Sequence, residues 1–127
     1  MNGYIGNIEE ITLANTFFRK VIYTGQHAQL VVMSLQPNED IGMEVHEVVD
    51  QFLRIEEGEG KVIINGEEQM VKNGSAILVP AGSQHNVINT SSTNQLKLYT
   101  VYSPPHHKDG VIHKTKIEAM ADTEDHL

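Results

Sequence analysis

The chain has 127 residues, the length of a single domain, and a formal net charge of −8 at pH 7. Proteins that bind nucleic acid need a basic surface, so we expect no nucleic-acid partner. The chain has no cysteine, which excludes disulfides, thiolate metal sites and cysteine nucleophiles. No apolar run approaches the length of a membrane span or a signal-peptide core, and we therefore expect a cytoplasmic protein without a membrane partner.

The first half of the chain contains strand patterns behind a short arm. Residues 1–15 hold loosely spaced apolar side chains and two glycines, which indicates an arm. The runs 17–23 and 29–35 are rich in apolar and β-branched residues and end at turn residues, so they predict strands. His27 lies beside the first turn and is interpreted as a solvated loop histidine. Asn65-Gly66 between two alternating runs predicts a β-hairpin.

The stretch 74–89 combines a strand, a turn and a histidine. Its apolar run meets Pro80 and Gly82, and His85 follows within three residues. Proline has no N–H for a strand ladder, and glycine permits the positive φ of a tight turn. We therefore expect a buried strand that turns and directs His85 back at the structure on which the strand packs.

The last third of the chain ends in a helix pattern. Strands are predicted at 86–89 and 96–103, a short helix at 115–121, and a frayed acidic tail at 122–127. Short, regularly spaced strands with one terminal helix favour an all-β barrel or sandwich. The predicted domain organisation is an arm at 1–15, a barrel at 16–114, and a helix with the tail at 115–127.

The pattern G-x5-P-x-G-x2-H-x3-N is complete in this chain, at Gly74, Pro80, Gly82, His85 and Asn89. It resembles the second motif of the cupin superfamily. The resemblance implies an all-β, double-stranded β-helix (jelly-roll) barrel with His85 as a metal ligand inside it. Because cupin arms often pair with a neighbouring subunit, the resemblance also implies a homodimer.

The first cupin motif is present in part. It runs H-x-H, three or four residues, a carboxylate, six residues and Gly. Counting back from Gly58 places Gln51 at the carboxylate position, and counting further places His46 and Glu44 at the two histidine positions. Asn38 stands where the family has an upstream glycine. The resemblance thus gives a mixed metal-ligand set: Glu44, His46, Gln51 and His85.

This ligand set suits a transition metal. Glu44 and His46 are two residues apart, so on a strand they project from the same face. Imidazoles with one carboxylate suit manganese, iron, nickel, copper or zinc better than calcium. The alternative is a metal-free, hydrogen-bonded polar cluster of Glu44, Gln51 and His85, because buried polar groups need partners.

Two residues near the end of the barrel are candidate catalytic groups. Tyr102 offers a phenol to a substrate, or else it packs and makes one hydrogen bond. The pair His106-His107 follows the last strand and is interpreted as lying at the barrel rim, where His107 is an acid or base that titrates near neutral pH; the alternative is an exposed loop that is rich in histidine. Strand alternation predicts that Lys97 points outward. The predicted inward set is Leu53, Ile55, Val87, Asn89, Leu96, Leu98, Thr100 and Tyr102.

Two classes of function remain open. The resemblance implies enzymes such as isomerases, epimerases, lyases and dioxygenases, which on this fold act on a small polar substrate, here a carbohydrate, sugar acid or carbonyl compound. The alternative is a metal-free or metal-assisted module that binds a small ligand. A jelly roll with a vestigial pocket is the third possibility.

Overall fold

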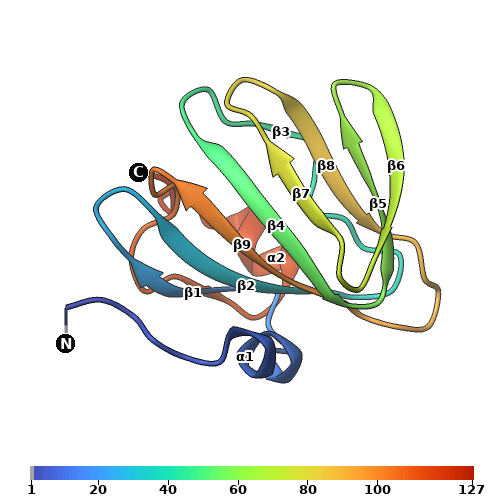
Figure 1. Ribbon diagram of the computed structural model, residues 1–127, viewed down its shortest axis with the longest axis horizontal. Helices are drawn as coiled ribbons and strands as arrows, with labels where there is room; N and C mark the ends of the chain where they lie inside the picture. Colours follow the sequence, from blue (N-terminus) through green and yellow to red (C-terminus); the bar gives the residue numbers. More distant parts are fainter. Residues whose placement is uncertain (1) are drawn as a thin grey trace.

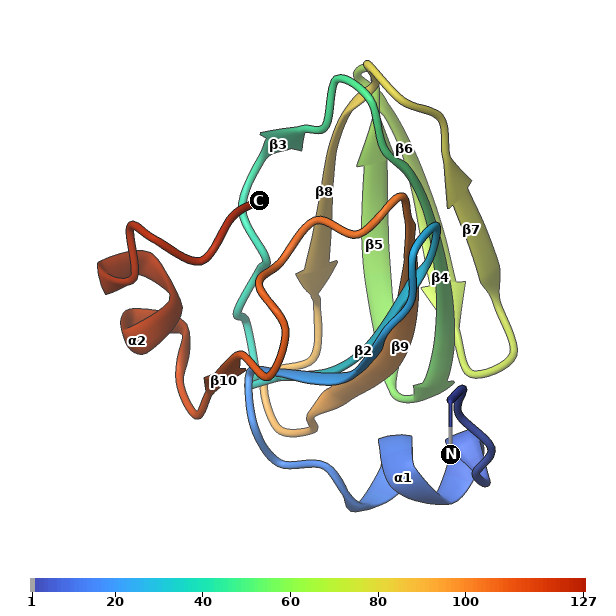
Figure 2. The same ribbon diagram turned by 90° about the vertical axis from the view of Figure 1, so that its left-hand side faces the viewer.

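The computed structural model describes residues 2–127 and has an all-β architecture with two short helices (Figure 1). Within these residues, six strands form one antiparallel sheet in the order β10-β1-β2-β9-β4-β7, and four form a second in the order β3-β8-β5-β6. The sheets enclose a jelly-roll barrel (Figure 2), which confirms the predicted fold class. The elements are α1 (Ile8–Ala14), β1 (Arg19–Thr24), β2 (Gln29–Leu35), β3 (Glu44–Val45), β4 (Asp50–Glu57), β5 (Glu59–Ile64), β6 (Glu67–Lys72), β7 (Ala76–Val79), β8 (Gln84–Asn89), β9 (Leu96–Ser103), β10 (Ile112–His113) and α2 (Lys116–Ala121).

Several elements lie where the sequence predicts them. Strands β2 and β9 match the predicted ranges 29–35 and 96–103, and α2 occupies the predicted C-terminal helix. The two turn residues of the β5–β6 hairpin, Asn65 and Gly66, have φ values of 49° and 84°, as a two-residue hairpin turn requires. The helices have 7 and 6 residues, and among residues 2–127 no helix is long and apolar enough to cross a membrane.

The predicted inward side chains form the core between the sheets. Leu53, Ile55, Leu96 and Leu98 are fully buried, at 0% exposure. They alternate along β4 and β9 with residues of the outer face, which is the period that a strand requires. Burying each such side chain contributes roughly 1.5–3 kcal/mol to stability. The core therefore fixes which face of β4 and β8 carries the polar candidates Gln51 and His85.

The glycine that ends the first cupin motif has no room for a side chain. Gly58 has a φ of 98°, and a Cβ there would lie 2.5 Å from the Gln95 main-chain oxygen. We expect Gly58→Ala to lower the free energy of unfolding by more than about 2 kcal/mol in urea denaturation, because strain and a clash add. Gly66→Ala is the matched control, since its φ is 84° but no atom lies within 4 Å of a Cβ. Equal losses would show that Gln95 moves away at no cost.

The N-terminal arm contains a helix that the sequence analysis did not predict. Helix α1 begins after Asn7, whose side-chain oxygen accepts a hydrogen bond from the Glu10 N–H at 3.1 Å. The helix lies against the larger sheet, where Lys97 Nζ donates to the Leu13 oxygen at 2.6 Å. Lys97 thus points out of the barrel, as predicted, but is covered by α1.

The homodimer, in which this arm was expected to pair with a neighbouring subunit, stays a prediction.

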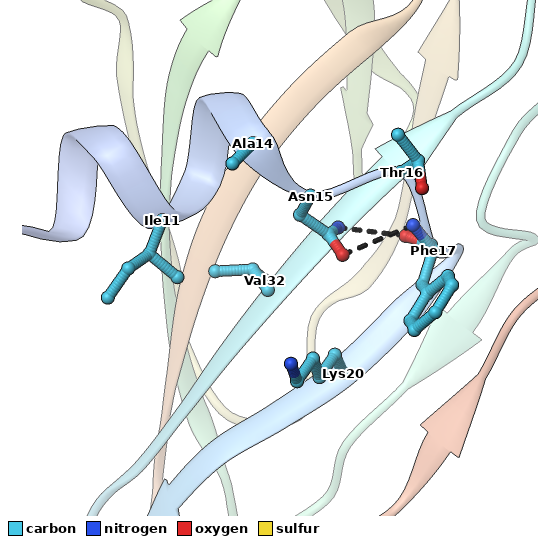
Figure 3. Close-up of a pocket in the computed structure, with 7 residues that line it drawn as sticks. All are labelled: Ile11, Ala14, Asn15, Thr16, Phe17, Lys20 and Val32. Atoms are coloured by element: carbon cyan, nitrogen blue, oxygen red, sulfur yellow. Dashed lines mark hydrogen bonds between the residues drawn. The ribbon is translucent and has the colours of Figure 1, made fainter.

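A cavity of about 280 Å³ lies between α1 and the sheet (Figure 3). Ile11 and Val32 supply apolar walls, and Lys20 is its one charged lining residue. The Asn15 amide donates to the Phe17 oxygen at 2.9 Å and accepts from the Phe17 N–H at 3.1 Å, so it is already paired. The residues that line this cavity include no acid–base pair and no histidine. We interpret the cavity as a gap left where α1 packs on the sheet.

The C-terminal tail is ordered against the barrel, so the predicted frayed tail is wrong. The Lys108 N–H donates to the Asp125 main-chain oxygen at 2.6 Å, and the Leu127 N–H donates to the His106 oxygen at 3.1 Å. Asp125 is buried, at 3% exposure. The Asp125 carboxylate accepts a hydrogen bond from the buried His107 ring, and this contact stabilises the position of the tail against the barrel.

Candidate metal centre

Glu44 and His46 lie at the start of the smaller sheet, opposite His85. In the pairing of β3 with β8, Glu44 is the direct partner of His85. Glu44 Oε2 lies 3.4 Å from His46 Nε2, close enough for an ion pair but without hydrogen-bond alignment. The rings of His46 and His85 are 5.1 Å apart between centroids. The fold therefore brings these three predicted residues together.

Gln51 and His85 are neighbours on β4 and β8, and both are buried. The Thr100 hydroxyl donates to the Phe52 oxygen at 2.9 Å, so it accepts from the Gln51 amide N–H at 3.0 Å. This chain of bonds aims Gln51 Oε1 at His85 Nε2, 3.2 Å away. His85 Nδ1 faces another acceptor, the Ser83 oxygen, at 3.0 Å. A neutral imidazole has one N–H for these two acceptors. When His85 Nδ1–H donates to the Ser83 oxygen, the lone pairs of His85 Nε2 and Gln51 Oε1 face each other. A cation bound between these two atoms satisfies both lone pairs.

His106 is the residue of this site that the sequence analysis missed as a ligand. Its ring centroid is 4.2 Å from that of His46, and donor atoms of Glu44, His46 and His106 lie within 4.8 Å of one another. We call these three residues the inner centre. Nε2 of His46 and Nε2 of His106 are buried and have no hydrogen-bond partner among residues 2–127. Unpaired buried nitrogens are costly, and a bound metal ion is one means of satisfying them.

Burial keeps the imidazoles of the inner centre neutral. Desolvation, followed by the nearby imidazoles, lowers the pKa of His46 to about 4 and the pKa of His106 to about 3. Burial raises the pKa of Glu44, although the charges of Arg19 and His85 oppose this. At neutral pH the two rings therefore offer lone pairs and not protons, which is the state that metal binding requires.

His107 lies behind the inner centre, and the predicted rim position is wrong because its exposure is 1%. Its Nδ1 is 2.6 Å from Asp125 Oδ2, and its Nε2 is 3.3 Å from the Tyr102 hydroxyl. Desolvation and then the charge of Arg19 lower the pKa of His107 to about 2. The expected titration of His107 near neutral pH is therefore wrong. Burial raises the pKa of Tyr102. The neutral ring donates Nδ1–H to Asp125. The catalytic roles of His107 and Tyr102 stay predictions.

Gln29 holds the two consecutive histidines by their main chain. Its Oε1 accepts from the N–H groups of His106 and His107, at 3.1 and 2.9 Å. Its Nε2 donates to the His107 oxygen at 2.7 Å and to the Thr24 hydroxyl at 2.9 Å. Gln29 is itself fully buried, at 0% exposure. Every polar atom of this amide is used to fix the segment that carries His106.

Comparison with known families assigns a cupin domain to residues 31–102, more than half of the chain. The chain belongs to the cupin superfamily. The crystal structure of BH2720 from Bacillus halodurans superposes on this cupin with a TM-score of 0.91 and 46% sequence identity, over 94% of each chain. Because it covers 94% of this chain, the match extends beyond residues 31–102 at both ends.

Two curated relatives extend the comparison. This cupin is 48% identical over 124 residues to the uncharacterized protein YrkC of Bacillus subtilis, a match that covers 93% of this chain and 66% of YrkC. It is 46% identical over 113 residues to the uncharacterized protein L612 of Acanthamoeba polyphaga mimivirus, covering 86% of this chain and 70% of L612. The chain thus spans about two thirds of the length of the relatives that it matches.

The altered first motif contains one left-handed residue that is not glycine. Asn38, at the position of the family glycine, has a φ of 63°, a left-handed conformation that asparagine adopts more readily than most residues. His106 lies outside both motifs, and its ring is next to Glu44 and His46, with donor atoms of the three residues within 4.8 Å of one another. The donor chemistry of one carboxylate and several neutral imidazoles fits a divalent transition metal.

Proposed function

We propose that this cupin is a small metalloenzyme that holds a divalent transition metal at Glu44, His46 and His106, with His85 and Gln51 beside them. The observation that carries the proposal is the pair of buried Nε2 atoms, on His46 and His106, that face a carboxylate and have no hydrogen-bond partner in the described chain. Manganese, iron, nickel, copper and zinc all accept such a mixed set. In a polar cluster without metal, no protein group of the described chain pairs with either nitrogen, and ordered water would have to satisfy both.

The proposed substrate is a small polar molecule such as a sugar, a sugar acid or another carbonyl compound. When bound, the metal supplies a Lewis acid that polarises a carbonyl or hydroxyl oxygen. The chain itself supplies rigid positioning. Gln29 fixes the main chain at His106, and Asp125 fixes the ring of His107, whose Nε2 contacts the Tyr102 hydroxyl. Tyr102 lies against the centre, with its ring centroid 5.4 Å from that of His106.

Elemental analysis of the purified protein tests the proposal. We expect about one equivalent per chain of manganese, iron, nickel, copper or zinc, and its loss in the triple variant Glu44→Ala, His46→Ala, His106→Ala, which removes all three ligands of the inner centre. His27→Ala is the control, because this exposed loop histidine lies in none of the groups that bring metal donors together. If the protein contains no metal even after incubation with each ion, the metalloenzyme is refuted and the hydrogen-bonded polar cluster is the better explanation.

A further inference from the structure

The C-terminal tail carries a third histidine to the segment that follows β9. His126 lies in an isolated β-bridge with His107, and the neighbouring Leu127 N–H bonds to the His106 oxygen. These contacts join residues that are far apart in the sequence. The main chain, through Asp125 and Leu127, therefore determines where the ring of His126 lies.

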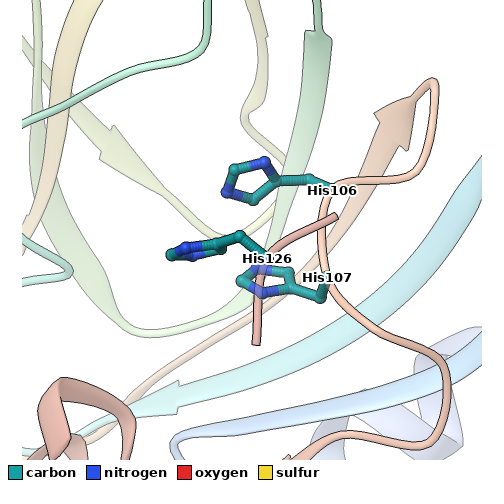
Figure 4. Close-up of side chains that lie close together, drawn as sticks. All are labelled: His106, His107 and His126. Atoms are coloured by element: carbon teal, nitrogen blue, oxygen red, sulfur yellow. The ribbon is translucent and has the colours of Figure 1, made fainter. Parts of the chain in front are cut away.

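Three imidazole rings gather at this contact (Figure 4). The ring centroid of His126 is 4.6 Å from that of His106 and 5.5 Å from that of His107, and one nitrogen from each ring lies within 4.8 Å of the others. His107 is buried, His106 is partly buried, and His126 is exposed. We call these three residues the tail site. It shares only His106 with the inner centre.

Asp125 gives the tail site the second layer of contacts that metal-binding histidines usually have. A histidine that binds metal through one ring nitrogen commonly donates its other N–H to a carboxylate, which fixes the tautomer and the ring. His107 Nδ1 is 2.6 Å from the buried Asp125 carboxylate, which leaves Nε2 as the free donor atom. Among residues 2–127, the one hydrogen-bond partner of Nε2 is the Tyr102 hydroxyl, which at 3.3 Å is distant and easily replaced.

We propose that His106, His107 and His126 form a second cation site, which takes a divalent ion that prefers imidazole ligands, such as Zn²⁺. Three protein ligands with one open position are the ligand count of catalytic zinc sites. A neutral imidazole has one lone pair for coordination, so His106 serves either the tail site or the inner centre at a given moment. The exposed tail site thus captures the ion, and His106 passes it to the inner centre.

Zinc titration of the chelator-treated, metal-free protein tests this second site. The double variant Glu44→Ala, His46→Ala removes two ligands of the inner centre and leaves the tail site intact. We expect this variant to keep one zinc equivalent by calorimetry. Adding His126→Ala to it should then weaken zinc binding at least tenfold, because even outer contacts of a metal site are worth about 10–100-fold. Adding His27→Ala instead should change nothing.

The outcomes separate this site from the proposed function. If the double variant binds no zinc while the unmodified protein does, or if His126→Ala leaves its zinc affinity unchanged, the tail site is refuted and the inner centre stands. If zinc binding in the otherwise unmodified protein is lost with His126→Ala but not with the double variant, the tail site stands and the inner centre fails. Circular dichroism checks that each variant is folded, and Glu44→Gln is the milder substitute if the double variant is not.

Asp125 provides an independent readout of the same site. In the background of the double variant, we expect Asp125→Asn to weaken zinc binding by about 10–100-fold, since the carboxylate that orients His107 is lost while all three ligands remain. Loading of the inner centre should also slow in His126→Ala, measured by stopped-flow with a chromophoric zinc chelator. An unchanged loading rate would refute capture by the tail.

Discussion

The metal-free protein is expected to lose stability steeply as the pH falls below 6.5. Burial lowers the pKa values of His46, His106 and His107 to about 4, 3 and 2. As the pH falls through 6.5, these three imidazoles become protonated in the unfolded chain but stay neutral in the folded chain. The stability is therefore fully present above pH 6.5 and declines as the pH falls toward the folded pKa values. Three protons correspond to a limiting slope of about 4 kcal/mol per pH unit, which is approached near pH 5. The average slope between pH 7 and pH 5 is about 3 kcal/mol per pH unit, which over two pH units is a large part of a domain's total stability.

Urea denaturation with a chelator at pH 7, 6 and 5 measures this slope. Glu44 acts in the opposite direction, because burial raises its pKa and protonation relieves a cost, but it is one group against three. The variant His106→Gln removes one of the three imidazoles and should reduce the slope by about one third. A flat profile between pH 7 and pH 5 would show that the folded protein protonates these rings freely.

Much of the fold follows from local sequence patterns. An apolar run that ends at turn residues predicts β2, and alternation predicts β9, both to the residue. Asn65-Gly66 predicts the hairpin, because turn conformation depends on neighbouring residues only. Helix α1 was missed although its signal is present: Asn7 caps the helix, and Glu9 and Glu10 occupy its first turn. The apolar residues of this segment are too loosely spaced to show a helical period beside the cap.

The candidate site was predictable only where it lies on strands. Glu44 and His85 are paired on neighbouring strands, Gln51 reaches His85 from β4 of the other sheet, and His46 directly follows β3. The other members of the two sites lie on the segment after β9 and on the tail, where no periodic pattern constrains the chain. Their positions depend on long-range contacts such as Leu127 with His106. The signal in the sequence was the density of histidine at 106, 107 and 126, but it gave no orientation.

Gln29 contacts only the main chain of the proposed ligands His106 and His107, yet its loss should strongly destabilise the protein. Replacing it by leucine keeps the approximate size but removes four hydrogen bonds, so the N–H groups of His106 and His107 and the His107 oxygen lose their partner. Because each buried unpaired group costs about 1–3 kcal/mol, we expect Gln29→Leu to lower the free energy of unfolding by at least about 3 kcal/mol in urea. Gln69→Leu, on the exposed face of β6, is the matched control and should change stability by less than about 0.5 kcal/mol.

The same substitution links stability to metal binding. Gln29 contacts no metal donor atom, yet it fixes the main chain that carries His106, which both proposed sites use. A displacement of that segment moves Nε2 of His106 away from His46 and Glu44, and metal geometry tolerates little such error. We therefore expect Gln29→Leu to weaken zinc binding as well, measured by calorimetry at a temperature where the variant is folded. Full zinc affinity in a destabilised but folded variant would mean that the tail contacts alone hold His106 in place.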